Sequence, residues 1–318
     1  MLELLSPAGS PEAVIAAVQN GADAIYMGMG NFNARRGAKN FSDEEFEKAV
    51  RYCRIRGCKV YVTLNTLVGD REMEAALAAA RLASQKGADA LLVQDLGLVR
   101  AIRQALPDIP IHASTQMSIH NLAGVEAAAE MGLTRAVLAR ELSLEQIKFI
   151  SRHASIETEI FVHGALCFCP SGQCYMSSLI GRRSGNRGMC AQPCRMQYSL
   201  GGRMDDFPMS LKDNCLIDRL KEIEDAGVKC VKIEGRMKRP EYTAIVTKIY
   251  SKAIKEQRQP TAEELSSLEK AFSRQGFTQG YFNGDKQDMF GTRQDADRDS
   301  EKMFTLARRA YAEGEMRR

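Results

Sequence analysis

The sequence has no apolar run that approaches the roughly 20 residues needed to cross a bilayer. Its N-terminus has no basic region followed by an apolar run, so no secretory leader is expected. The nine cysteines are an odd number, which argues against a framework of paired disulfides. These absences predict a soluble, cytoplasmic protein that has no membrane partner.

An excess of charge of one sign is also missing. The 318 residues include 44 Lys and Arg against 40 Asp and Glu, a net charge of +4. This balance excludes a uniformly basic surface for nucleic acid, but it permits a local basic patch. Neither His-Glu-x-x-His nor Gly-x-Ser-x-Gly occurs, so these two hydrolase signatures are absent. No Gly-x-Gly-x-x-Gly follows an expected strand, so a dinucleotide-binding sheet has no support.

Short β-branched runs alternate with longer amphipathic segments over the first two-thirds of the chain. Ser10-Pro11 and Ser42 with Glu45 have the spacing of helix N-caps. Glycines end several helices, where a positive φ is needed. The pattern predicts an α/β fold, a (β/α)8 TIM-like barrel, with a doubly wound sheet as the alternative. The expected strands are 3–5, 24–27, 59–64, 90–94, 109–113, 136–139, 157–162 and 230–233.

The expected barrel covers residues 1–258 and has one long cysteine-rich insertion, 165–213, after the seventh strand. A helix is expected over 214–226. Residues 259–284 should form a C-terminal helix and an aromatic, glycine-containing segment that pack on the barrel. Residues 285–318 are rich in charge and read as a tail or linker. Loops after barrel strands open on the catalytic face, so the insertion should lie over the barrel mouth.

Five of the nine cysteines fall within residues 159–194, and four of them form the expected metal-ligand set: Cys167, Cys174, Cys190 and Cys194. Four thiolates bind either zinc or an iron–sulfur cluster. Structural zinc sites use two short Cys-x-x-Cys pairs, which this sequence lacks, and wide spacing favours a larger [4Fe–4S] cubane. Zinc, and unligated thiols or disulfides, stay open as alternatives. Cys169 is an alternative ligand or a small packing residue.

Charged residues follow three of the expected strands. Arg35, Arg140, Lys232 and Arg236 are the candidate binding residues for a small dicarboxylate, because Arg grips a carboxylate with two parallel hydrogen bonds. The alternative is that Glu141 or Glu234 merely pairs with these arginines at the barrel rim. The candidate proton-transfer and catalytic groups are His163, Glu141 and Glu234.

Basic residues of the insertion form a candidate RNA-binding rim. Its members are Arg182, Arg183, Arg187 and Arg195, joined by Lys238 and Arg239 after the eighth strand. Tyr175 and Phe168 could stack on a flipped base or shield the cluster from water. A solvated loop surface is the alternative for the whole set.

Several blocks of sequence resemble the bacterial collagenase-like peptidases, the U32 peptidase family of unknown catalytic type. They are Glu159-x-Phe161-x-x-Gly164-Ala165-Leu166-Cys167, Gly172-x-Cys174, Gly185-Asn-Arg-Gly188, Cys190-x-x-Pro-Cys194-Arg195 and Lys232-Ile-Glu-Gly-Arg-Met-Lys238. The resemblance covers about residues 2–284. It implies one of two activities, peptide hydrolysis or hydroxylation of RNA bases.

The second activity implies more about cofactors and partners. RNA-modifying relatives make 5-hydroxyuridine at the tRNA wobble position or 5-hydroxycytidine in large-subunit rRNA, with an iron–sulfur cluster and prephenate as oxygen source. The family's cluster ligands match the four cysteines above. Some members carry a further C-terminal domain, so a missing domain or a second protein subunit is expected to assist. The remaining alternatives are a collagenase-like peptidase and a non-catalytic iron–sulfur partner subunit.

Overall fold

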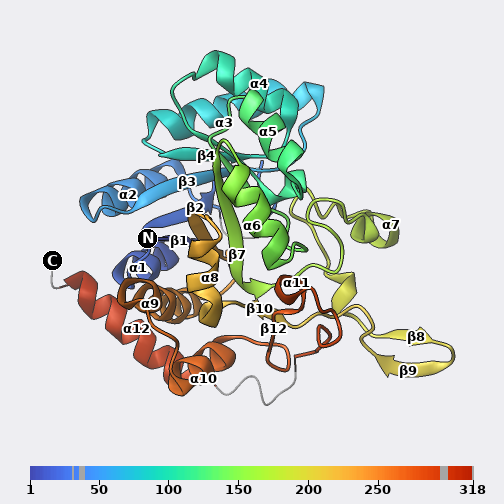
Figure 1. Ribbon diagram of the computed structural model, residues 1–318. Coiled ribbons are helices and arrows are strands. Elements are labelled where there is room, and N and C mark those ends of the chain that lie inside the picture. The colour runs from blue at the N-terminus through green and yellow to red at the C-terminus, as the bar shows by residue number, and fades with distance from the viewer. Residues whose placement is uncertain (31, 36–39, 294–299, 317–318) are drawn as a thin grey trace.

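A closed barrel of eight parallel strands forms the body of the protein. The computed structural model describes residues 1–30, 32–35, 40–293 and 300–316. Strands pair in chain order from β1 to β7, and β11 closes the ring by pairing with both β7 and β1 (Figure 1). The predicted (β/α)8 fold is therefore confirmed. The barrel strands are β1 Glu3–Pro7, β2 Ala24–Gly28, β3 Lys59–Leu64, β4 Ala90–Val93, β5 Ile111–Ala113, β6 Arg135–Val137, β7 Glu157–Ala165 and β11 Cys230–Ile233.

Helices surround the barrel and begin at polar caps. The Ser10 side chain accepts from the N–H of Ala13 with Pro11 next to the cap, and Ser42 forms a reciprocal capping box with Glu45. Gly87 ends one helix at φ 94°, a value that suits glycine. The surrounding helices are α1 Pro11–Gln19, α2 Asp43–Ile55, α3 Met73–Gln85, α4 Leu96–Ala105, α5 Leu122–Glu130, α6 Leu144–His153, α8 Leu220–Asp225 and α9 Pro240–Glu256.

The apolar core has two layers. The larger layer lies between the sheet and the helices and includes Phe46, Ile102 and Tyr250. A smaller cluster fills the barrel itself and includes Tyr26 and Phe161. Alternate residues along each strand point inward, so the strand ends decide what lines the mouth.

A β-bulge changes the course of β7. Lys232 of β11 lies opposite Phe161, but the next residue, Ile233, lies opposite His163, so β7 has one extra residue here. Beyond the bulge, Asp213–Cys215 forms β10, which pairs antiparallel with β7, and β12 (Phe277–Thr278) extends this edge. The helix expected over 214–226 is thus only partly correct, because its start is drawn into this strand. It contributes the 3-10 turn η4 (Ile217–Arg219) and α8.

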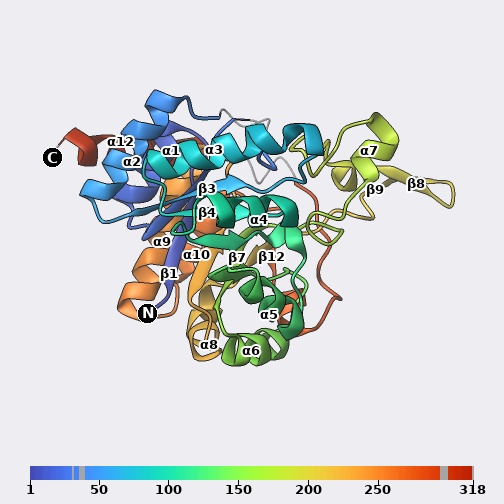
Figure 2. The ribbon, with the colours of Figure 1, turned by 90° about the horizontal axis from the view of Figure 1, so that it is seen from above.

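The cysteine-rich insertion projects from the barrel. Its helix α7 (Met176–Gly181) and its hairpin of β8 (Tyr198–Leu200) and β9 (Arg203–Asp206) extend to one side in both views (Figures 1 and 2). Short 3-10 turns complete this part and the mouth: η1 Asp70–Glu72, η2 Thr115–Met117 and η3 Pro193–Arg195.

The end of the chain forms helices, including one in the region that was expected to be a charged tail. Helix α10 (Ala262–Ala271) packs on α9, α11 (Gly280–Asn283) follows β12, and α12 (Glu301–Met316) packs across both α9 and α1 (Figure 1). Phe304 and Tyr311 of α12 are buried, and Arg308 pairs with Glu241. Residues 294–299 of the expected tail lie outside the described residues. No helix in the described ranges is long and apolar enough to cross a membrane.

Candidate functional site

Two arginines hold a glutamate at the centre of the barrel mouth. Glu234 directly follows β11, and its two oxygens accept from Arg35 at 3.2 Å and from Arg140 at 3.0 Å. Burial would raise the pKa of Glu234, but Arg35 and Arg140 outweigh it and hold the pKa at about 2. The alternative that Glu234 pairs with arginines at the barrel rim therefore agrees with the structure.

A third guanidinium in the mouth, that of Arg236, forms no ion pair with a carboxylate in the described part of the chain. Arg236 is buried and donates to the Thr63 hydroxyl at 2.7 Å and to Asn33 Oδ1 at 3.4 Å. Burial first, and Arg35 second, lower its pKa to about 10. Gly28 makes room for Arg236 and Asn33, because a Cβ there would lie 2.8 Å from Asn33 Cγ and 3.0 Å from Arg236 Nη1. Arg35, Arg140 and Arg236 thus outnumber Glu234, and the mouth favours an anionic ligand.

Lys232, expected among the binding residues, lies deeper inside the barrel. Its ammonium pairs with Glu159 at 2.9 Å and lies 4.4 Å from the ring centroid of Tyr26. Both charged side chains are buried, and Arg135 approaches the second Glu159 oxygen at 3.5 Å. The inward alternation of β11 places Lys232 one layer below Glu234. We therefore assign Lys232 to the ion pair within the barrel.

His163 lies outside the barrel wall, because the bulge in β7 turns its side chain away from the mouth. Its ring is buried against Tyr242 and Tyr250 of α9 and Phe277 of β12. Burial, followed by the nearby Lys238, lowers its pKa to about 3. The structure does not bring this predicted proton-transfer group to the mouth. Glu141 lies on the insertion side of the mouth, where its charge acts on Tyr281 and Cys169.

The four predicted ligand cysteines gather at the base of the insertion. The pKa of the Cys194 thiol is raised by burial first, and the charges of Cys167, Cys190 and Cys174 add to the rise against the opposing effect of Arg195. Ser177 donates to Cys190 Sγ at 3.9 Å, and the N–H of Gln192 donates to it at 3.3 Å. Within the described residues, no three His, Cys, Asp or Glu side chains are positioned to bind a single metal ion.

Arg140 joins the cysteine segment to the mouth. Besides Glu234, its guanidinium donates to Cys167 Sγ at 3.7 Å and to the Ser171 hydroxyl at 3.2 Å. It stacks 4.0 Å from the ring centroid of Phe161. One residue therefore contacts both parts of the candidate site.

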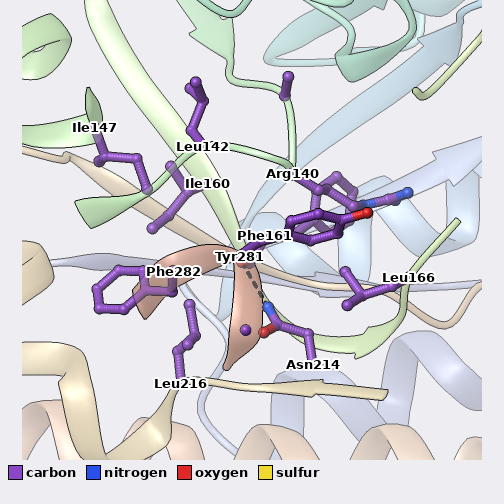
Figure 3. Close-up of a pocket in the computed structure, with 12 residues that line it drawn as sticks. Arg140, Leu142, Ile147, Ile160, Phe161, Leu166, Asn214, Leu216, Tyr281 and Phe282 are labelled. Carbon is purple, nitrogen blue, oxygen red and sulfur yellow. Dashed lines mark hydrogen bonds between the residues drawn. The ribbon is translucent and has the colours of Figure 1, made fainter. Parts of the chain in front are cut away.

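Tyr281 of α11 lies next to Arg140 and was not among the predicted site residues. Figure 3 shows its ring beside Phe161 and Arg140. These residues line a narrow cavity of about 20 Å³, which has room for roughly one water molecule. Burial first, then the charges of Glu141 and Cys167, raise the pKa of its phenol. The only sequence signal was the aromatic, glycine-containing composition of residues 276–284.

The basic residues of the insertion divide into two groups. Arg187 pairs with Glu72 and donates to the Leu67 carbonyl at 2.5 Å, and Arg195 donates to the carbonyls of Leu166 and Leu211. These two residues therefore brace the insertion. Arg182 and Arg183 are exposed, although Arg183 also donates through Nε to a carbonyl of its own loop.

Asn186 fastens the same segment to the barrel. Its amide donates to Gln94 Oε1 at 2.7 Å and to Gln116 Oε1 at 3.3 Å, and its oxygen accepts from the N–H of Leu67 at 2.9 Å. These partners follow β3, β4 and β5. The link between Cys174 and Cys190 is thereby fixed to three barrel loops.

The ion pairs of Glu234 predict a loss of stability in acid. Because the pKa of Glu234 is about 2 in the folded protein and 4.5 ordinarily, its contribution is complete above pH 4.5 and is lost as the pH falls toward 2. We expect a loss of about 3 kcal/mol from this group. Denaturant unfolding at a series of pH values should show a shallower dependence for Glu234→Gln, and parallel curves would contradict the assignment.

Comparison with known proteins places these features in a family. A model described as Peptidase family U32 matches residues 9–290. The chain belongs to peptidase family U32. The U32 chain is 40% identical over 306 residues to the 23S rRNA 5-hydroxycytidine C2501 synthase of Escherichia coli (strain K12), and this match covers 91% of the chain and 46% of that protein. It is 36% identical over 264 residues to tRNA hydroxylation protein P1 of Bacillus subtilis (strain 168), covering 79% and 63%.

The U32 chain therefore spans about half to two-thirds of the length of these two relatives. The solved structure of the U32 peptidase Mk0906 aligns with it at a TM-score of 0.52 and 14% identity, over 74% of this chain and 93% of that one. At this identity the likeness supports the barrel fold alone.

Proposed function

We propose that this chain is the catalytic barrel of an RNA-base hydroxylase whose [4Fe–4S] cluster is bound by Cys167, Cys174, Cys190 and Cys194. The observation that carries the proposal is Arg140, which contacts both Cys167 Sγ and the anion-binding mouth. The similarity to an rRNA hydroxycytidine synthase and a tRNA hydroxylation protein supports RNA as the substrate. We expect this RNA hydroxylation to take place in the cytoplasm.

The four thiols suit a cluster better than a single ion. The charges of Cys167, Cys174 and Cys190 all raise the pKa of the Cys194 thiol, which supports a common site for the four. A cubane holds its thiolates further apart than one tetrahedral ion does, so the cluster does not require a single-ion arrangement. When bound, the cluster would supply redox or Lewis-acid chemistry beside the mouth.

The mouth would bind the oxygen donor as a dianion, and prephenate is the proposed donor. Arg236 has no carboxylate partner among the described residues, and Arg35 and Arg140 could each exchange Glu234 for a ligand carboxylate. The released Glu234 would then be available to hold a proton at the reacting group. Tyr281 and Phe161 flank the site with flat apolar surface.

The insertion would bind the RNA. The exposed Arg182 and Arg183 would contact RNA phosphates, and Phe168 and Tyr175, both exposed, would stack on bases.

Among the described residues, no contact in the site favours the collagenase-like peptidase alternative. Ser177, which lies between Cys174 and Cys190 in the sequence, donates to Cys190 Sγ and accepts from the N–H of Ala191 at 3.1 Å. Its hydroxyl is thus committed to the cysteine segment. A non-catalytic iron–sulfur subunit, the third possibility, would bind a cluster but modify no RNA by itself.

Complementation with Cys174→Ala tests the proposal. A strain that lacks the gene should regain one hydroxylated pyrimidine in its tRNA or rRNA when the wild-type chain is supplied, measured by mass spectrometry of nucleosides. The Cys174→Ala chain should restore less than about 1% of it, because loss of one ligand releases the cluster.

The matched control is Cys53→Ala, a buried cysteine of α2 outside the insertion, which should restore modification fully. Anaerobically purified protein should absorb near the blue edge of the visible, and this band should vanish with Cys174 but not with Cys53. Full modification by Cys174→Ala would overturn the cluster. A cluster without any RNA modification would favour the partner-subunit alternative.

A further inference from the structure

A second group of basic side chains lies beside the barrel rim, around the ring of Phe272. Lys238 Nζ is 2.7 Å from the ring centroid, and the guanidinium carbons of Arg274 and Arg293 are 4.8 Å and 4.2 Å from it. Lys238 belongs to the loop after β11, whereas the other residues follow α10 and β12. Three separate stretches of chain therefore direct cations to one half-buried aromatic ring.

One carboxylate of this group, Asp213, is paired with Arg274. Asp213 of β10 is buried, and both of its oxygens accept from Arg274 Nη1, at 2.7 Å and 2.8 Å. In the described ranges Lys238 forms no ion pair, and a phenyl ring offsets only a small part of a cation's charge. Among the residues that the structure describes, the Lys238 charge therefore has no counter-ion.

The titration of Lys238 reflects this imbalance. Burial lowers its pKa to about 7, and the like charges of Arg274 and Arg293 add to the effect, against Asp213 and Glu234, which oppose it. Burial lowers the pKa of the neighbouring His163, and Nε2 of its ring has no hydrogen-bond partner among the described residues. An anion bound here would therefore raise the pKa of Lys238 and draw a proton onto it.

The group lies close to the proposed active site but not in it. Asp213 pairs with Ala165 in the register of β10 and β7, so it borders the first residues of the insertion. Lys238 follows Glu234 by four residues, yet its side chain lies on the outer side of the wall with Tyr242 and Phe272. A ligand held here would reach the rim of the mouth from outside.

We propose that Lys238, Arg274 and Arg293 form a phosphate-binding site separate from the barrel mouth. Phosphate suits it better than a carboxylate, because its oxygens point in several directions and can meet an ammonium and two guanidinium groups from different elements. The phosphate is either a free ion or part of an RNA backbone. The RNA form rests on the proposed function, whereas the free-phosphate form does not.

Binding measurements with Lys238→Met test the site. The probes are inorganic phosphate, followed by calorimetry, and a fluorescein-labelled single-stranded RNA of about 12 nucleotides, followed by anisotropy at low salt. Loss of Lys238 should weaken the binding of at least one probe by about tenfold. The matched control is Lys229→Met, an exposed lysine at the opposite end of β11, which should change neither affinity by more than about twofold.

Each result decides something. Weaker phosphate binding by Lys238→Met identifies a site for the free ion, and weaker RNA binding with no phosphate binding identifies a backbone site.

Proton uptake gives a second measurement. Binding to the wild-type protein near pH 8 should take up a proton, so the heat of binding should differ between buffers of different ionisation enthalpy. Lys238→Met should abolish this difference. Equal affinities of Lys238→Met and Lys229→Met for both probes would overturn the proposal. If Lys238→Met does not fold, Arg293→Gln replaces it in the same comparison. None of these measurements requires the hydroxylase reaction.

Discussion

Replacing Glu159 by glutamine is expected to lower the free energy of unfolding by about 3–5 kcal/mol. Glu159 is fully buried in the barrel, where its carboxylate pairs with Lys232 at 2.9 Å and approaches Arg135 at 3.5 Å. A neutral amide leaves the Lys232 ammonium inside the barrel without a counter-charge, and desolvating such a charge is costly. Equilibrium unfolding in urea measures the loss.

Two further variants separate the ion pair from general disruption of the barrel. Glu159→Gln combined with Lys232→Met removes both charges and should recover a large part of the loss. Glu157→Gln changes a carboxylate two residues earlier on β7, which is 49% exposed, and should cost less than about 1 kcal/mol. If the double variant is no more stable than Glu159→Gln alone, the buried pair is not the cause.

Arg140→Lys is expected to reduce RNA hydroxylation by about 100-fold while the protein stays folded. This expectation follows from the proposed function. Arg140 contacts Glu234, Ser171 and Cys167 at once and stacks on Phe161. Lysine keeps the charge but cannot reach several partners with a planar fork, so the mouth and the cysteine segment lose their shared contact.

The control for this variant is Arg152→Lys, which alters a surface contact to the carbonyl of Asp225 at 2.9 Å. Modified nucleosides are counted by mass spectrometry, and iron is measured in the same preparations. We expect Arg140→Lys to lose modification more than iron. Unchanged modification would show that Arg140 does not link the two parts of the site.

The barrel could be predicted because its signals are local. The bounds expected for β3 and β11 agree with the structure, and the caps at Ser10 and Ser42 form as their spacing indicates. Each of these signals depends on neighbours within a few residues. Sequence reasoning also placed Arg35, Arg140, Glu234 and Arg236 together, because the ends of parallel strands meet at one face.

The remaining features depend on partners far along the chain. The bulge that turns His163 outward is visible only in the pairing of β7 with β11, some 70 residues later. Arg187 and Arg195 looked like exposed cations because Glu72 and the Leu211 carbonyl lie in distant segments. Helix α12 was expected to be a tail because its charged composition hid Phe304 and Tyr311, whose partners are elsewhere in the chain.

Helix α12 also has a consequence for how the barrel opens. β1 and β11 form the junction where the two ends of the barrel sequence meet, and α12 packs across the helices that follow these strands, α1 and α9. Separation of the junction must therefore detach α12 as well. Amide hydrogen exchange should therefore be slow in both β1 and β11. The first and last βα units should exchange as one cooperative block instead of fraying independently.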